Sequence, residues 1–213
     1  MNRISAIAAV LLVSGALNCF DVATAADSES ATPAQTESPA NIYRDSIHAV
    51  FTIRSGQTLG SGFTIASGYL VTNAHVVGDS TSVEVEQQNG DTFRAKVVKK
   101  DSDHDFAILE PEGIRPFTTI LALPSGSAPA IGEGIVVIGS PGGMKGTLTT
   151  GVVSQIYPDG VVQLNVAVNP GNSGGPVLDM HGRVFGIAAY KYTKGDGIGF
   201  AIPISWVKSE EPK

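Results

Sequence analysis

A serine in a glycine-rich loop is the residue of this chain best suited to act as a nucleophile. Ser173 lies in the segment 169–176 (NPGNSGGP), where three glycines surround it and an apolar strand is expected to follow. Gly171, two residues earlier, has no side chain to restrict its backbone angles. The N–H groups of Gly171 and Ser173 are therefore expected to form a two-donor oxyanion hole. The alternative interpretation is a glycine-rich turn with an incidental serine.

Acyl transfer by a serine also needs a base, and His75 is the histidine with the most suitable surroundings. It follows an apolar strand and opens a short turn, in the segment 70–77 (LVTNAHVV). His48 fits the alternation of a strand and is expected to be a partly buried structural residue. His181 lies in a polar turn and is expected to be solvated. His75 is therefore predicted to take the proton of the nucleophile.

A carboxylate that orients the base is expected at Asp105. It directly precedes the apolar run 106–109, at the point where the chain enters a strand. A carboxylate there can be partly shielded while it accepts the Nδ1–H of an imidazole, which fixes the tautomer and stabilises the imidazolium. Asp101 and Asp103 lie in a polar turn, where solvent would weaken either of them in this role, and the adjacent His104 is a competing histidine. The order His, Asp, Ser matches one of the arrangements known for such triads.

About a dozen short strands are predicted to position these residues. Their apolar or alternating runs are broken by Gly, Pro, Asn and Asp, a pattern typical of a barrel or sandwich. Helical signals are weak, with short turns expected at 74–77 and 205–208. The predicted strands cover residues 47–53, 62–65, 69–72, 82–86, 92–98, 107–109, 134–139, 147–156, 161–165, 176–178, 184–189 and 198–201.

Composition excludes several classes of protein. The 213 residues are 42% apolar and 16% charged, which is a globular balance. The formal net charge of −6 argues against a nucleic-acid partner, because such binding needs a basic face. The only cysteine is Cys19, in a segment expected to be removed, so a cysteine nucleophile and a thiolate metal site are excluded. We expect no metal and no other cofactor, because the histidines lack ligand spacing and serine chemistry needs none.

The N-terminal residues predict export. Residues 1–25 have the pattern of a signal peptide, with a basic residue, an apolar stretch over 4–17 and a small-x-small motif at 23–25. The apolar stretch is short for a membrane span, so we expect a periplasmic or secreted protein without stable membrane insertion. The alternatives are an anchor that stays in the membrane and a lipid anchor at Cys19, which the preceding Asn18 disfavours.

The rest of the chain is expected to form one domain with polar extensions. Residues 26–41 contain almost no large apolar side chain and are predicted to be a flexible linker. The folded domain is expected over 42–207, and a polar tail over 208–213.

Three segments resemble the catalytic blocks of trypsin-like peptidases of the HtrA (Deg) type. They are 72–77 (TNAHVV), 105–109 (DFAIL) and 171–176 (GNSGGP), and further similar segments are 60–63, 138–141 and 197–203. The resemblance covers about 42–205 in the family's order. It implies an all-β fold of two perpendicular six-stranded antiparallel β-barrels. His75 and Asp105 would come from the first barrel and Ser173 from the second, with the active site in the cleft between them.

The resemblance also implies a mode of substrate binding. Residues Ile187, Ala188, Ala189 and Tyr190 would form the strand that pairs with an extended polypeptide, a pairing that suits unfolded chains. The walls of the S1 pocket would hold no carboxylate other than Asp196, so we expect cleavage after small or medium aliphatic residues.

The resemblance also bears on further domains and on oligomerisation. HtrA proteins usually carry PDZ domains after the protease, and about ten residues follow Pro203 here, so we expect a protein that lacks one. Trimerisation is left open.

A serine endopeptidase that works through an acyl-enzyme is the predicted function. A catalytically silent module of the same fold that binds extended peptides is the main alternative. A third interpretation is an esterase that uses the same triad.

Overall fold

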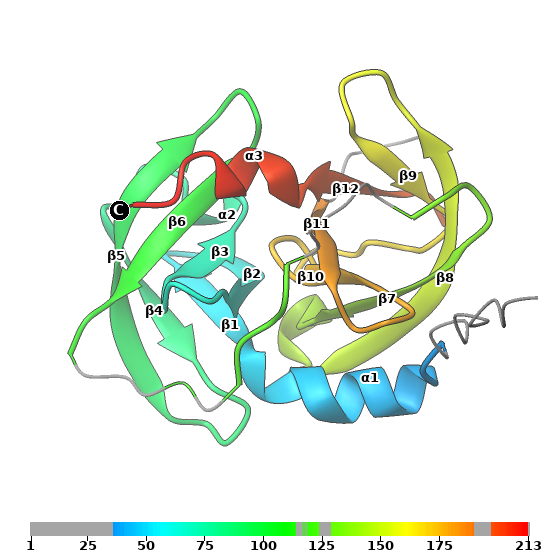
Figure 1. Cartoon of the computed structure of the whole chain (residues 1–213). Coiled ribbons are helices and arrows are strands. Elements are labelled where there is room, and N and C mark those ends of the chain that lie inside the picture. The colour runs from blue at the N-terminus through cyan, green and yellow to red at the C-terminus, as the bar shows by residue number, and fades with distance from the viewer. Residues whose placement is uncertain (1–35, 114–116, 118, 124–128, 190–196, 213) are drawn as a thin grey trace, which may run out of the picture. The chain divides into compact units, whose positions relative to one another are not determined.

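Two closed antiparallel barrels of six strands each make up most of the chain (Figure 1). The computed structural model describes residues 36–113, 117, 119–123, 129–189 and 197–212. The prediction of two six-stranded antiparallel β-barrels is therefore confirmed. In chain order the elements are α1 (Pro39–Ser46), η1 (Ile47–Ala49), β1 (Val50–Ser55), β2 (Thr58–Thr64), β3 (Leu70–Thr72), α2 (Ala74–Val77), β4 (Ser82–Glu86), β5 (Thr92–Asp101), β6 (Phe106–Pro111), β7 (Gly134–Gly139), η2 (Pro141–Gly143), β8 (Thr147–Ile156), β9 (Val162–Leu164), β10 (Pro176–Asp179), β11 (Val184–Ala189), β12 (Gly199–Pro203) and α3 (Ile204–Lys208).

Barrel 1 contains β1 to β6 in the order β1-β2-β3-β6-β5-β4 and closes where β4 pairs with β1. Side chains along its strands alternate between buried and exposed, as the sequence predicts. In β4, Val83 and Val85 are buried while Glu84 between them is exposed. Inside the barrel the rings of Phe51 and Phe93 meet edge to face, with centroids 6.1 Å apart. This apolar interior holds the strands that carry α2 and the turn before β6.

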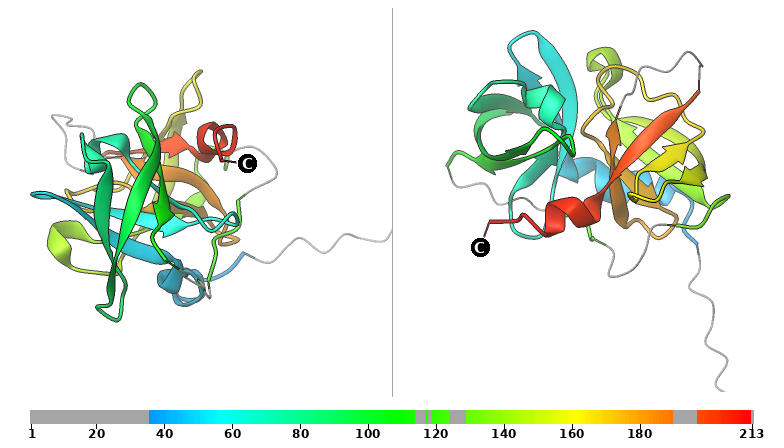
Figure 2. Two further views of the ribbon diagram at one scale, coloured as in Figure 1. Left: turned by 90° about the vertical axis from the view of Figure 1, so that its left-hand side faces the viewer. Right: turned by 90° about the horizontal axis from the view of Figure 1, so that it is seen from above.

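Barrel 2 contains β7 to β12 in the order β10-β11-β12-β9-β8-β7 and closes where β10 pairs with β7. The right-hand view of Figure 2 shows β1 to β6 and β7 to β12 as two barrels side by side. Strand β11 is buried at every position, because one of its faces lines the barrel interior and the other packs toward barrel 1.

A third apolar cluster joins the two barrels. It takes residues from strands of both barrels and is completed by side chains of α1 and α3. Glu210, two residues after α3, forms an ion pair with Lys99 of β5 in barrel 1, at 2.7 Å. Because this cluster is fully buried, the two barrels are fixed against each other by apolar packing. Its central members are Ile42, Phe63, Phe106, Ile138, Ile187 and Val207.

Helix α1 corrects the expected boundary between linker and domain. The predicted flexible linker over 26–41 is wrong at its end, because the helix begins at Pro39. Ser38 caps it by accepting the N–H of Asn41 at 3.2 Å, and Ile42 is buried against both barrels. Ser at the N-cap followed by Pro in the first turn favours a helix start.

The start of β1 also differs from the expectation. The predicted strand over 47–53 begins only at Val50, because residues 47–49 form a 3₁₀ turn. His48 lies in that turn and is exposed, so the prediction of a partly buried histidine is wrong. The predicted signal peptide over 1–25 lies outside the described residues. Within the described part of the chain, no helix is long and apolar enough to cross a membrane.

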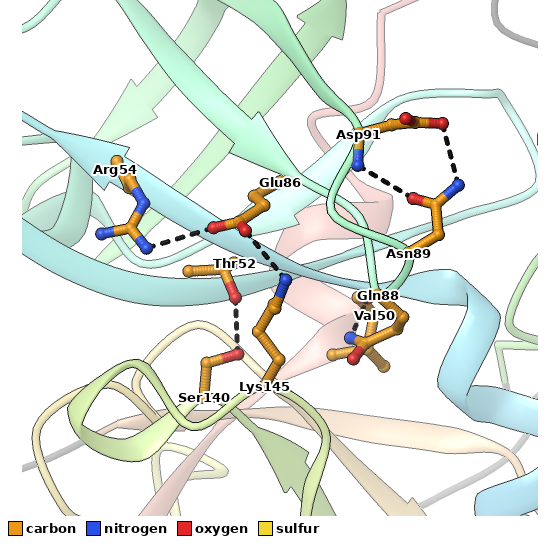
Figure 3. A network of polar contacts seen from close by, with 9 residues as sticks. All are labelled: Val50, Thr52, Arg54, Glu86, Gln88, Asn89, Asp91, Ser140 and Lys145. Atoms are coloured by element: carbon orange, nitrogen blue, oxygen red, sulfur yellow. Dashed lines mark hydrogen bonds and ion pairs between the residues drawn. The ribbon is translucent and has the colours of Figure 1, made fainter.

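A polar network on β1 and β4 adds a second link between the barrels (Figure 3). The Glu86 carboxylate accepts from Lys145 Nζ at 2.8 Å, which comes from the turn before β8, and from Arg54 Nη2 at 3.1 Å. These bonds, that from Lys145 first, lower the pKa of Glu86 below its ordinary value of 4.5. The charged form of Glu86 therefore stabilises the folded state.

The substitution Glu86→Gln is expected to lower the free energy of unfolding by about 1 kcal/mol at pH 7. Because the pKa is lower in the folded protein, this contribution is complete above the unfolded value of 4.5 and is lost as the pH falls through the folded value. Denaturant unfolding of both proteins at several pH values measures the difference, with exposed Glu84→Gln as the control. A difference that stays constant down to about pH 3 would contradict this account.

Candidate active site

His75 and Asp105 are bonded to each other through both side chain and backbone. His75 lies in α2, directly after β3, and its Nδ1 is 2.8 Å from Asp105 Oδ2 and 3.0 Å from Oδ1. The backbone N–H of His75 also donates to Oδ1, at 3.0 Å. The two side chains are 44% and 33% exposed. The carboxylate is thus held by two donors of one residue, which fixes the orientation of the imidazole ring.

The backbone of Asp105 adopts a conformation that few residues tolerate. Its φ is +55°, and it is the only non-glycine residue with a positive φ in the described part of the chain. Asn73 Nδ2 donates to its carbonyl at 2.8 Å and holds the turn in place. Asp is one of the side chains that accept this region at modest cost. A strained backbone maintained at such a position is typical of a functional site.

The two competing aspartates lie at the end of β5, for Asp101, and in the turn that follows it, for Asp103. Asp101 Oδ2 is 2.8 Å from Nδ1 of His104, whose ring packs on Trp206 with centroids 4.4 Å apart. The backbone N–H of His104, and then its side chain, lower the pKa of Asp101. The exposed Asp103 donates its backbone N–H to Asp101. Asp105 is therefore the aspartate of this turn that contacts His75.

The segment around Ser173 is inserted against barrel 1. Ser173 is 3% exposed, and its carbonyl accepts the N–H of Ser61 in β2 at 2.7 Å. A Cβ added to Gly60 would lie 2.6 Å from a methyl of Val76 and 3.1 Å from the Ser173 carbonyl oxygen. The residue after His75 and the backbone of Ser173 thus pack against the same glycine. Segments more than 90 residues apart in the chain meet at the contact between the barrels.

The peptide before Gly171 has a defined orientation. The carbonyl of Pro170 accepts the N–H of Gly142 at 3.0 Å, and the peptide is trans, so the N–H of Gly171 points away from Gly142. Gly171 has a φ of +105°, and a Cβ there would collide with the carbonyl oxygen of Ser140. The position therefore requires glycine.

The predicted peptide-binding strand needs correction at two of its residues. Strand β11 is paired on both sides at Ile187, with β10 and with β12. Ala188 donates its N–H to Gly175 and accepts the N–H of Gly174, each at 2.8 Å. Because these backbone groups are already bonded, Ala188 holds the segment around Ser173, and neither Ile187 nor Ala188 has a free edge at which a peptide could pair. Ala189 is the last described residue of the strand, and Tyr190 lies outside the described residues.

A cavity of about 200 Å³ adjoins Asp105 and Ala189. Its apolar lining residues come from β11, β12, α3 and the residue before β9, and three aspartates also line it. Such a cavity fits one aliphatic side chain next to the histidine–aspartate pair. Its remaining lining residues are Asp103, His104, Asp159, Val161, Phe200, Ile202 and Trp206, and the predicted pocket residue Asp196 lies outside the described residues.

The segment 171–175 has the G-x-S-x-G spacing that is also found in the nucleophile elbow of α/β-hydrolases. An elbow requires a strand, the serine and then a helix. Here Ser173 is followed by strand β10 of an antiparallel barrel. The fold therefore excludes an α/β-hydrolase esterase.

Two residues of the site escaped the sequence analysis. Ser61 and Asn73 both lie in motifs that resemble the family, but neither was assigned a role. Asn73 holds the carbonyl of Asp105, and Ser61 bonds the nucleophile segment. The flanking glycines of Ser61, in the segment 60–62, were the only local signal of a close approach.

Comparisons with known proteins agree with this geometry. Residues 60–187 match the family described as "Trypsin-like peptidase domain". The chain is 40% identical over 144 residues to a probable periplasmic serine endoprotease DegP-like of Bartonella henselae, which covers 62% of this chain and 28% of that protein. It is 37% identical over 145 residues to the periplasmic serine endoprotease DegP of Escherichia coli K12, which covers 63% and 30%.

Solved structures are similar over a larger share of the chain. The crystal structure of the serine endoprotease from Yersinia pestis superposes with a TM-score of 0.73 and 30% identity, covering 81% of this chain and 64% of that one. The HtrA-type protease AlgW with tripeptide gives a TM-score of 0.72 and 30% identity, covering 81% and 62%. The chain spans less than a third of the length of the two curated relatives above.

Proposed function

The chain belongs to the trypsin-like peptidase family, and from this membership we propose that it is a serine endopeptidase with Ser173 as nucleophile, His75 as base and Asp105 as orienting carboxylate. The observation that carries the proposal is the short contact of Nδ1 of His75 with the Asp105 carboxylate, at 2.8 Å. When Nδ1–H donates to the carboxylate, the neutral ring carries its lone pair on Nε2. That nitrogen is then the base for the serine hydroxyl.

The proposed reaction proceeds through an acyl-enzyme. His75 takes the proton of Ser173 Oγ as Oγ attacks the peptide carbonyl, and Asp105 stabilises the imidazolium. The N–H groups of Gly171 and Ser173 stabilise the oxyanion. The imidazolium then protonates the leaving amine, and water hydrolyses the acyl-enzyme through the same groups in reverse.

The proposed substrate is an unfolded or extended polypeptide, cut after small or medium aliphatic residues. The apolar residues that line the cavity beside Ala189 and Asp105 support the binding of an aliphatic side chain there. The similar protease AlgW was solved with a tripeptide. Incubating the chain with a denatured protein and sequencing the products tests this preference. Cuts dominated by Arg or Lys at P1 would contradict it.

We also propose that the protein is exported, with cleavage of a signal peptide before Ala26. The relatives from Bartonella henselae and Escherichia coli are named as periplasmic, which supports export. N-terminal sequencing of the protein from a periplasmic fraction tests it, and a cytoplasmic protein that retains residue 1 would contradict it.

A catalytically silent peptide-binding module is the competing function. The wild-type chain, incubated with a fluorophosphonate probe, is expected to be labelled at Ser173, because only an activated serine reacts rapidly. A wild type that binds denatured protein and stays unlabelled would favour the silent module.

A further inference from the structure

Ser61 is a buried residue of barrel 1 whose polar groups are mostly directed at barrel 2. It lies in β2 and is 0% exposed. Its hydroxyl donates to the carbonyl of Gly171 at 2.6 Å and accepts the N–H of Ser140 at 2.9 Å. Its N–H donates to the carbonyl of Ser173 at 2.7 Å. Ser61 therefore holds two carbonyls of barrel 2, that of Gly171 and that of Ser173.

The hydroxyl of Ser61 holds the carbonyl side of the peptide that follows Gly171. The peptide before Gly171 is held at its carbonyl by the N–H of Gly142, at 3.0 Å. The peptide after Gly171 is held at its N–H, which Asn172 donates to the carbonyl of Asn169 at 2.9 Å, and at its carbonyl by the Ser61 hydroxyl. The N–H of Ser140 also reaches the Gly171 carbonyl, but at 3.3 Å. Without the hydroxyl, the Gly171 carbonyl keeps only this longer bond, and Ser140 loses its 2.9 Å acceptor. Both groups are buried, so they would rearrange to recover partners.

The local sequence around Ser61 permits this contact. Gly60 and Gly62 flank it, and a Cβ on either would come within 3.1 Å of neighbouring atoms. A Cβ on Gly139, across the boundary, would lie 3.1 Å from the Ser61 hydroxyl. The absence of side chains at Gly60 and Gly139 lets the two barrels approach until a serine, the smallest hydroxyl side chain, spans the gap.

We infer that Ser61 is a positioning residue for the oxyanion hole: its hydroxyl, supplied by barrel 1, holds the carbonyl of Gly171 and so fixes the Gly171–Asn172 peptide, which directly follows the peptide that carries the Gly171 N–H. The inference rests on the proposed function, in which the Gly171 N–H is one of the two oxyanion donors. Ser61 itself does not contact the substrate in this mechanism and acts through Gly171.

A second buried hydroxyl provides a matched control. Thr52 Oγ1 lies 2.7 Å from Ser140 Oγ, and this bond also crosses between the barrels (Figure 3). Thr52 is 0% exposed, as Ser61 is, and the two residues are paired across β1 and β2. The hydroxyl of Thr52 bonds to the side chain of Ser140 and not to a backbone carbonyl of residues 171–173. Thr52→Val therefore removes an inter-barrel hydroxyl bond without releasing the nucleophile segment.

The test compares full-length Ser61→Ala and Thr52→Val on a quenched fluorescent peptide built on a mapped cleavage site. For Ser61→Ala, kcat is expected to fall about 10- to 100-fold while KM changes less than about threefold, because the Gly171 N–H would be misaligned and its bond to the oxyanion forms only in the transition state. Thr52→Val is expected to keep kcat within about threefold. Affinity for a peptidyl trifluoromethyl ketone, which forms a tetrahedral adduct with the serine, should fall in parallel with kcat. Affinity for the product peptide acid should not change.

Two results would overturn the inference: kcat of Ser61→Ala equal to that of the wild type, or equal losses in both variants, which would indicate barrel packing alone. If Ser61→Ala does not fold, Ser61→Cys keeps the volume with a weaker donor and is expected to give a kcat between the wild-type value and a hundredth of it, with KM unchanged. An unlabelled wild type, or full turnover by Ser173→Ala, would instead refute the proposed function, and so remains distinguishable from failure at Ser61.

Discussion

Replacing Ser173 by alanine is expected to lower kcat by on the order of 10⁶-fold, because no acyl-enzyme can form without its Oγ. The remaining rate would come from substrate binding and from the oxyanion donors. The fold should be retained, since the backbone bonds of the segment, from Ser61 to the Ser173 carbonyl and from Gly174 to Ala188, involve no serine side chain. Turnover of the fluorescent peptide and thermal unfolding of the variant measure the two parts of this prediction.

The control for this variant is Ser67→Ala, at an exposed turn of barrel 1, which should keep full activity. Fluorophosphonate should label the wild type and the control but not Ser173→Ala. Normal labelling of Ser173→Ala would show that another residue is the nucleophile.

Asp105→Asn is expected to lower kcat about 10⁴-fold near neutral pH by imposing the wrong imidazole tautomer. The backbone N–H of His75 needs an acceptor at the Oδ1 position, so the amide oxygen of the asparagine should take that place. The NH₂ group then occupies the Oδ2 position, 2.8 Å from Nδ1 of His75. The ring must accept there and carry its proton on Nε2, where it cannot take the proton of Ser173.

The control for Asp105→Asn is the same substitution at a nearby aspartate. Asp103→Asn changes an exposed carboxylate in the same turn and is expected to keep kcat within about threefold. The folded state of Asp105→Asn should be retained, because asparagine also accepts a positive φ. Equal losses of kcat in both variants would contradict the orienting role, since they would reflect the charge of the turn and not the tautomer.

Much of the fold could be predicted from local sequence because its strands are short and regularly interrupted. Alternation such as that of Val83, Glu84 and Val85 specifies which face of a strand is buried, and glycine-containing turns separate the strands. Helix α1 was missed because it lies in a polar stretch and is stabilised by Ile42 and Tyr43, which pack against distant strands. Tertiary packing outweighed local composition there.

In the candidate site, too, some residues could be predicted from local sequence and others depend on the tertiary structure. The motifs around His75, Asp105 and Ser173 could be found locally, since each combines a reactive side chain with a characteristic turn. The misassignment of Ile187 and Ala188 arose because the number of neighbours a strand has is a property of the whole sheet. The bond from Lys145 to Glu86 joins residues 59 positions apart and leaves no local pattern.

The division of the proposed triad between two barrels has a consequence for the life of the molecule before it is fully folded. A nascent or damaged chain with only one barrel formed holds either the imidazole and its carboxylate or the serine, and neither set can cleave a peptide. Peptide hydrolysis is therefore expected only after the two barrels have packed together at Ser61. A copy in which they have not yet packed is expected to be inactive, and its unfolded part is a potential substrate for folded copies.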